Sequence, residues 1–131
     1  MTEVKVLVVD DDKDSLDLIN EVLLEAGYEV ICASSGPDAV KILQDTKPVV
    51  VILDIMMPGM NGFAVLEGIR ASPHLKAIPV IIVTACPIQE YGQYAMDSSP
   101  TCIFCKPLDL KILVDTVKMY VNDSKIGVTK Y

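Results

Sequence analysis

The stretch Pro48-Val49-Val50-Val51-Ile52-Leu53-Asp54 decides the fold class. Five consecutive apolar residues stand here between a proline and an aspartate. A short apolar run without polar alternation is typical of a strand buried on both faces, as in a parallel sheet. The run Val4–Val9 has the same character and is broken only by Lys5. We therefore expect a parallel sheet with helices on both of its faces.

Stretches with helical periodicity separate the strand-like runs. The expected strands are Val4–Val9, Glu29–Ala33, Val49–Leu53, Pro79–Thr84 and Thr101–Cys105. The expected helices run from the N-cap Asp12 to Gly27, from Ser35 to Thr46, over Phe63–Ile69 until Pro73, over Gln89–Ser98 and over Leu108–Asn122. Strands that alternate with helices form right-handed βαβ units. The predicted fold class is α/β, with a doubly wound five-stranded parallel sheet.

Length and charge limit the class of protein. The 131 residues amount to about one domain. The chain has 18 acidic and 11 basic residues, a formal charge of −7, and Arg70 is its only arginine, which disfavours direct binding to nucleic acid. No apolar run is long enough for a membrane span, and residues 1–5 carry no signal-peptide pattern. We expect a single cytoplasmic domain over 1–122 and a polar tail over 123–131.

The cysteines are expected to be reduced and buried. All four lie in or next to strand-like runs, where a free cysteine packs as a small apolar residue. They are Cys32, Cys86, Cys102 and Cys105. The last two have C-x-x-C spacing, but a redox pair of this kind opens a helix and a zinc site needs a second pair of ligands. The spacing therefore indicates neither kind of centre.

Polar side chains end or follow four of the expected strands. They are Asp10-Asp11-Asp12 after the first, Asp54 after the third, Thr84 in the fourth and Lys106 after the fifth. The carboxyl ends of parallel strands share one edge of the sheet, and ligands bind there where the strand order reverses. We expect several carboxylates, a hydroxyl and an ammonium group to converge at this edge.

These residue types suit phosphoryl chemistry. Clustered carboxylates repel one another, so they need compensation from Lys106 and from a divalent cation. Oxygen ligands without histidine or thiolate suit Mg²⁺, for which Mn²⁺ can substitute. Asp54 can act as a nucleophile and form an aspartyl phosphate. The metal and Lys106 would neutralise charge on the phosphoryl oxygens, and Thr84 would donate a hydrogen bond to one of them.

Each of these features also has a purely structural explanation. The aspartates after the first strand can favour a helix N-terminus, Asp54 can be a turn residue, and Thr84 can be a β-branched strand residue. These explanations do not predict that all the polar residues lie at strand ends that share one edge. The combination favours a functional site, with Asp12 left as a helix cap.

At these residues the sequence resembles the response-regulator receiver domain of two-component signal transduction, of the chemotaxis-regulator type, over Val4–Val121. The strongest motif is the segment Leu53-Asp54-Ile55-Met56-Met57-Pro58-Gly59-Met60-Asn61-Gly62, which is similar to the family's loop around its phosphorylated aspartate. Further motifs are Val8-Val9-Asp10-Asp11-Asp12, Val83-Thr84-Ala85 and Lys106-Pro107. The resemblance implies a flavodoxin-like (βα)5 fold with strand order 2-1-3-4-5.

The resemblance also implies roles for the acidic residues. Asp54 would accept a phosphoryl group from a sensor histidine kinase or a phosphotransfer protein. Asp11, Asp54 and the backbone carbonyl of Met56 would bind Mg²⁺ directly, and Asp10 would act mainly through metal-bound water.

Two further residues complete the implied mechanism. Lys106 would pair with the phosphoryl group, and its peptide bond to Pro107 would be cis. Thr84 would move to bond the phosphoryl group and so switch the conformation. The resemblance implies a signalling phosphoacceptor that assists its own phosphorylation and dephosphorylation, and not an enzyme in the usual sense.

The face that would pass on the signal departs from the family pattern. The resemblance implies a homodimer through the fourth helix, the fifth strand and the last helix. The family usually has an aromatic switch residue three positions before the lysine, whereas this chain has Ile103 there, followed by Phe104.

Two alternatives remain open. A phosphatase of the haloacid-dehalogenase type would use Asp10 as the nucleophile together with Asp12, Thr84 and Lys106, although this chain has Asp14 where that family usually has Thr or Val. Turnover of a phosphomonoester that survives Asp54→Ala would favour it. The second alternative is a receiver that binds a partner without being phosphorylated.

Overall fold

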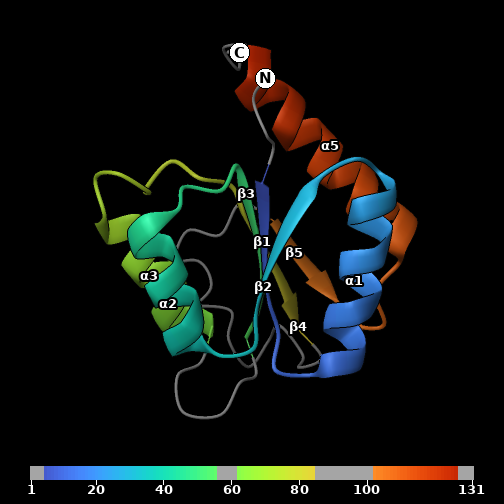
Figure 1. Ribbon diagram of the computed structural model, residues 1–131, viewed down its shortest axis with the longest axis horizontal. Helices are drawn as coiled ribbons and strands as arrows, with labels where there is room; N and C mark the ends of the chain where they lie inside the picture. Colours follow the sequence, from blue (N-terminus) through green and yellow to red (C-terminus); the bar gives the residue numbers. More distant parts are fainter. Residues whose placement is uncertain (1–4, 56–61, 85–101, 127–131) are drawn as a thin grey trace.

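Figure 1 shows the computed structural model, which describes residues 5–55, 62–84 and 102–126. The strands are β1 Lys5–Val9, β2 Glu29–Ala33, β3 Val50–Asp54, β4 Val80–Thr84 and β5 Cys102–Cys105. They form one parallel sheet in the order β2-β1-β3-β4-β5. The described helices are α1 Lys13–Glu25, α2 Gly36–Asp45, α3 Gly62–Ala71 and α5 Leu110–Ile126. The predicted fold class and strand order are confirmed, and the helix expected over Gln89–Ser98 lies outside the described residues.

The strand β3 lies at the centre of the sheet. It pairs with β1 on one side and with β4 on the other. Every residue of β3, Val50–Asp54, is buried. The uninterrupted apolar run of this strand reflects burial on both faces of a parallel sheet.

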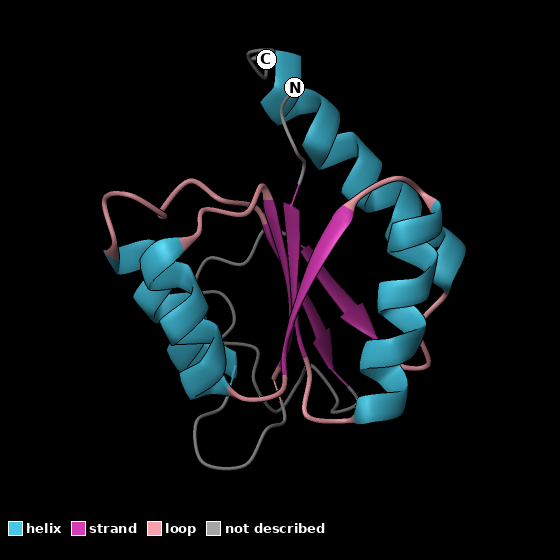
Figure 2. Ribbon diagram, in the orientation of Figure 1, coloured by secondary structure: helices cyan, strands magenta, loops and turns pink. Residues whose placement is uncertain are grey.

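Helices cover both faces of the sheet (Figures 1 and 2), with α2 and α3 on one face and α1 and α5 on the other. Successive residues of β1 alternate between the two faces. Leu7 and Val9 belong to the apolar core under α2 and α3, and Val6 and Val8 belong to the core under α1 and α5. Two apolar cores therefore hold the strands in place and leave the carboxyl edge of the sheet to polar residues.

Capping side chains fix the first two helices. Asp12 accepts a hydrogen bond from the backbone N–H of Ser15 at 3.3 Å and begins α1. Gly27, with a φ of 96°, follows the end of α1. Ser35 accepts a hydrogen bond from the backbone N–H of Asp38 at 3.2 Å and begins α2. These caps agree with the starts and the end predicted from the sequence.

The helix α5 differs from its prediction at both ends. Asp109 accepts two backbone hydrogen bonds, at 3.0 and 3.2 Å, so the helix begins at Leu110, two residues later than predicted. It continues to Ile126, past the predicted end at Asn122, because the next helix-breaking residue in the sequence is Gly127. Within the part of the chain that the structure describes, no helix has both the length and the apolar character that crossing a bilayer requires.

The prediction that the cysteines are buried is wrong for two of them. Cys32 and Cys105 are exposed, and Cys102 is half-buried. These residues belong to β2 and β5, the two strands at the edges of the sheet, which have a neighbouring strand on one side only. Cys86 lies outside the described residues.

Candidate functional site

Three aspartates meet at the carboxyl edge of the sheet. The register that pairs Val9 with Leu53 brings Asp10, directly after β1, next to Asp54 at the end of β3. Carboxylate oxygens of Asp10, Asp11 and Asp54 all lie within 4.8 Å of one another. Asp10 is 2% exposed and Asp54 4% exposed, whereas Asp11 is exposed. The strand-end rule therefore predicted this convergence correctly.

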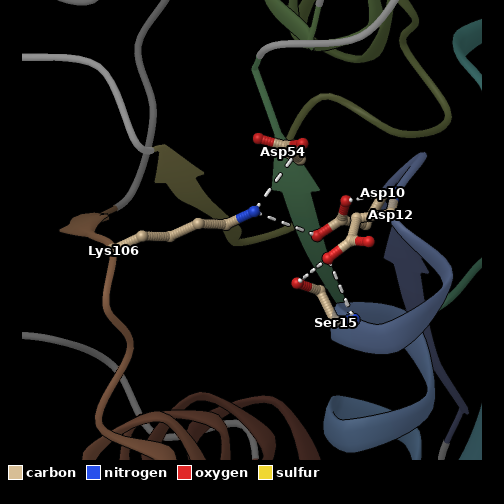
Figure 3. Close-up of polar contacts among 5 residues, drawn as sticks. All are labelled: Asp10, Asp12, Ser15, Asp54 and Lys106. Carbon is tan, nitrogen blue, oxygen red and sulfur yellow. Dashed lines mark hydrogen bonds and ion pairs between the residues drawn. The ribbon is translucent and has the colours of Figure 1, made fainter.

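Lys106 reaches the same cluster from the other side (Figure 3). Its ammonium nitrogen lies 3.4 Å from Oδ2 of Asp10 and 3.9 Å from Oδ2 of Asp54. The backbone N–H of Lys106 donates to the carbonyl oxygen of Thr84 at 2.9 Å, which holds the residue after β5 against the end of β4. The peptide bond from Lys106 to Pro107 is cis, as predicted.

Thr84 is the last residue of β4, the strand that lies between those leading to Asp54 and Lys106. It is 1% exposed. Since Asp54 pairs with Val83, Thr84 lies one residue further toward the carboxyl edge. The hydroxyl-bearing residue is therefore in the expected position in the sheet. Met56, whose carbonyl was predicted as a metal ligand, lies outside the described residues.

Asp12 stands beside the cluster as a helix cap. Its carboxylate accepts hydrogen bonds from the hydroxyl of Ser15 at 2.7 Å and from the backbone N–H of Ser15 (Figure 3), and these bonds hold the pKa of Asp12 below its usual value. The backbone N–H of Asp12 donates to Oδ1 of Asp10 at 2.9 Å. This bond was not predicted, although aspartate side chains commonly bond the backbone two residues further on. Both oxygens of Asp10 are therefore engaged.

Gly62 makes a second contact that the sequence did not predict, with the backbone that follows β3. It is the first residue of α3, and its backbone N–H donates to the carbonyl oxygen of Ile55 at 3.0 Å. A Cβ atom at this position would overlap the carbonyl oxygen of Asp54. The sequence motif contains this glycine, but only the three-dimensional packing reveals that it lies against the backbone of the central aspartate.

The donor set fits a hard divalent cation. With all four groups ionised, the three carboxylates and the Lys106 ammonium leave two negative formal charges. One divalent cation would balance these charges. The ligand atoms are carboxylate oxygens, which Mg²⁺ prefers over nitrogen or sulfur. The residues present are therefore those that a magnesium site requires.

The position three residues before Lys106 departs from the family pattern in the structure as well. Ile103 packs against the core under α2 and α3, whereas Phe104 packs against the core under α1 and α5. The aromatic ring thus belongs to the opposite face of β5 from the residue in the usual switch position.

Comparisons with known proteins place the chain among receiver domains. The model of the response regulator receiver domain matches residues 6–118. The chain is 32% identical over 114 residues to the response regulator PleD of Caulobacter vibrioides, a match that covers 87% of this chain but only 25% of PleD. It is 32% identical over 113 residues to the protein PilH of Pseudomonas aeruginosa, which covers 86% of this chain and 93% of PilH.

The fold is also found among solved structures. A receiver domain protein (CheY-like) from Methanospirillum hungatei superposes with a TM-score of 0.88 at 22% identity, covering 97% of this chain and 100% of that chain. This likeness concerns the fold, and the family match over residues 6–118 rests on the sequence. The chain belongs to the response regulator receiver domain family.

Proposed function

We propose that the chain is a phosphoacceptor, in which Asp54 receives a phosphoryl group from a phosphohistidine on a sensor kinase or a phosphotransfer protein. Receiver domains of two-component systems interact with such partners and bind Mg²⁺ through acidic residues. The observation that carries the proposal is the position of Asp54. It is a buried carboxylate at the end of the central strand, within reach of two further carboxylates and 3.9 Å from the Lys106 ammonium.

The bonds made and broken in the transfer involve only Asp54 and the phosphohistidine donor. An oxygen of the Asp54 carboxylate attacks the phosphorus atom, and the bond from phosphorus to the histidine nitrogen breaks. The electron pair of that bond returns to the imidazole nitrogen, which takes up a proton. Lys106 neutralises negative charge on the phosphoryl oxygens during this step. The hydroxyl of Thr84 then donates a hydrogen bond to the phosphoryl group and carries the change into β4.

The metal ligands would be Asp11, Asp54 and the carbonyl oxygen of Met56, with Asp10 acting through a bound water. An indirect role suits Asp10, because the Asp12 N–H and Lys106 already engage its two oxygens. When bound, Mg²⁺, or Mn²⁺ in its place, would supply positive charge to offset that of the phosphoryl oxygens and of the three carboxylates.

The wider role is part of the same proposal. The domain over 1–122, with its polar tail over 123–131, acts in the cytoplasm as a signalling module, without direct contact to nucleic acid or membrane. It signals by a change of conformation and forms a homodimer through the face that includes β5 and α5. The chain spans only a quarter of the length of PleD.

Intact-mass spectrometry tests the proposal. The protein is incubated with Mg²⁺ and acetyl phosphate, and a gain of one phosphoryl group is expected. The gain should require Mg²⁺ and should be lost in Asp54→Ala. No gain in the unchanged protein would leave the binding-only alternative in place. Turnover of a phosphomonoester that survives Asp54→Ala and is lost in Asp10→Ala would instead favour the phosphatase alternative.

A further inference from the structure

Gly62 lies in direct contact with the backbone of the proposed phosphoacceptor. A Cβ atom added at this position would overlap the carbonyl oxygen of Asp54 and would lie 2.8 Å from Cα and 2.9 Å from Cδ1 of Ile55. Two of these three atoms belong to the backbone, so no rotation of a side chain can clear the space. Any residue other than glycine would push the start of α3 and the peptide after Asp54 apart.

The requirement for glycine comes from this contact and not from the backbone conformation. Among the described glycines, Gly27 is the one with a positive φ. Gly68 lies on the same helix as Gly62, but a Cβ atom added there would meet nothing within 4 Å. The two glycines of α3 therefore differ in one respect that matters for the site, which is contact with the backbone of Asp54 and Ile55.

A hydrogen bond reinforces the contact. The backbone N–H of Gly62 donates to the carbonyl oxygen of Ile55 at 3.0 Å, so the start of α3 is tied to the residue directly after Asp54. On the other side, Asp54 is held in the sheet by its pairing with Val83 of β4. The backbone of Asp54 is therefore fixed from the sheet and from α3 together. This determines where its carboxylate stands relative to Asp10 and Lys106.

We propose that Gly62 is a positioning residue for phosphoryl transfer. It allows α3 to pack directly on the peptide that follows Asp54 and thereby aligns the Asp54 carboxylate with the metal ligands and the Lys106 ammonium. The inference rests on the proposed function, because it concerns the same reaction. The expected consequence is kinetic. A misplaced Asp54 carboxylate still takes part in binding, but it reacts more slowly.

A methyl group at position 62 should lower the rate of phosphoryl uptake even among the molecules that remain folded. The overlap with backbone atoms can be relieved only by shifting the Asp54 peptide or the first turn of α3. Misplacement of a reacting group by about 1 Å costs on the order of 100-fold in rate. For Gly62→Ala we expect a loss of roughly 10- to 100-fold in the maximal rate of uptake per folded molecule. The acetyl phosphate concentration for half-maximal rate should stay near its original value.

The test compares four variants with the unchanged protein: Gly62→Ala, Gly68→Ala, Ile55→Val, and Gly62→Ala combined with Ile55→Val. In the assay an oxygen of Asp54 attacks the phosphorus atom of acetyl phosphate, and acetate leaves with the electron pair of the broken P–O bond. The rate is measured at saturating Mg²⁺ over a series of acetyl phosphate concentrations, well below the unfolding temperature of each variant. Circular dichroism gives the folded fraction.

Gly68→Ala is the matched control, because it adds the same methyl group to the same helix and should leave the uptake rate unchanged. Ile55→Val removes the Cδ1 atom that the added Cβ would touch. It leaves the contacts with the carbonyl oxygen of Asp54 and with Cα of Ile55. The double variant should therefore be slower than Ile55→Val by the same factor by which Gly62→Ala is slower than the unchanged protein. Full rescue by Ile55→Val would overturn the proposal, since it would reduce the effect to side-chain crowding.

Other outcomes separate this inference from the proposed function. If the unchanged protein takes up no phosphoryl group, the proposed function fails. If the unchanged protein reacts and Gly62→Ala reacts at the same rate per folded molecule, only the role of Gly62 is overturned. If Gly62→Ala does not fold, the substitution is combined with Gly68→Ala in one chain, because alanine at position 68 improves the helix propensity of α3. Failure of that variant to fold would assign Gly62 to stability and overturn its role as a positioning residue.

Discussion

The ammonium nitrogen of Lys106 lies 3.4 Å from a carboxylate oxygen of Asp10, a residue 96 positions earlier in the chain. The contact joins the end of β5 to the end of β1 across the carboxyl edge of the sheet. Asp10 is almost fully buried, whereas the Lys106 side chain is 25% exposed. The lysine therefore compensates a carboxylate that water cannot solvate, and several properties of the domain depend on it.

Replacing Lys106 with methionine should destabilise the domain when no divalent cation is present. The change keeps most of the side-chain volume but leaves the buried carboxylates without their ammonium partner. Loss of one partner of a buried pair costs about 3 kcal/mol or more, and the partial exposure of Lys106 reduces this to roughly 1–2 kcal/mol. Urea unfolding without divalent cations measures the loss, and added Mg²⁺ should restore part of it.

Lys111→Met is the control for this experiment. Lys111 pairs with Asp115 at 3.5 Å on the exposed face of α5, where both side chains are well solvated. Such a pair contributes about 0.3–0.5 kcal/mol. Equal losses in free energy of unfolding for the two variants would contradict the compensating role of Lys106.

Mg²⁺ should stabilise the folded domain, and Asp11→Asn should remove most of this effect. A ligand at about 100 times its Kd adds about 2.7 kcal/mol to the free energy of unfolding. In the absence of Mg²⁺ the same variant should be more stable than the parent by about 1 kcal/mol, because one of three repelling carboxylates is gone. Thermal unfolding with and without Mg²⁺ measures both effects. Asp115→Asn should leave the response to Mg²⁺ intact, and an equal loss of response there would argue against a specific site.

The cap at Asp12 should contribute a pH-dependent stability. Hydrogen bonds from Ser15 lower the pKa of Asp12 in the folded state, so the folded state favours the ionised carboxylate. The stabilisation is complete above the unfolded pKa of about 3.9 and is lost as the pH falls through the lower folded pKa. Unfolding measured over this acidic range should show a smaller pH dependence for Asp12→Ala than for the parent.

The same substitution should weaken Mg²⁺ binding, since the Asp12 side chain fixes the start of α1 through Ser15 and so positions the backbone N–H that donates to Asp10. Ser35→Ala is the matched control, because it removes the corresponding cap from α2 and should cost about 1 kcal/mol of stability. Calorimetric titration should show a weaker Kd for Asp12→Ala and the parent value for Ser35→Ala. A parallel weakening in both would mean that general loss of stability, and not the cap at the site, controls the affinity.

Thiol alkylation should be slow at neutral pH for two cysteines. Burial of part of each side chain raises the pKa of Cys32 and of Cys102, and the nearby Asp17 adds to the effect at Cys32. Because the thiolate is the reactive form, a raised pKa leaves less of it near pH 7. Mass spectrometry of the peptides follows the reaction of each cysteine with iodoacetamide. In the folded protein the rate should rise at a higher pH than in the urea-unfolded chain. Identical pH profiles for folded and unfolded protein would contradict the shift.

The strand-end rule explains why so much of the site could be predicted. The apolar runs before Asp10 and Asp54 identified two central strands, and parallel strands end at one edge. The shared edge follows from the topology of the sheet, whatever the packing of the side chains. The contact of Gly62 with the Asp54 backbone depends instead on distances of a few tenths of an ångström, which no spacing in the sequence encodes. The bond from the Asp12 N–H to Asp10 does have a local signal, because aspartate side chains commonly bond the backbone two residues further on.

The errors have equally local causes. Cys32 and Cys105 were expected to be buried because their strands are apolar, yet both belong to edge strands in the order that the family resemblance already implied. The helix α5 begins after the predicted Leu108 because Asp109 caps it, and it passes the predicted end at Asn122 because the polar residues that follow are accepted by a helix until Gly127.

Site mapping of the acyl phosphate tests the central claim most directly. After incubation with Mg²⁺ and acetyl phosphate, the protein is treated with borohydride, which reduces an aspartyl phosphate to homoserine, and is then digested and sequenced by mass spectrometry. We expect homoserine at position 54, and none anywhere in the chain for Asp54→Ala. Homoserine at position 10 or 11 in place of 54, or a phosphoryl group retained by Asp54→Ala, would contradict the claim.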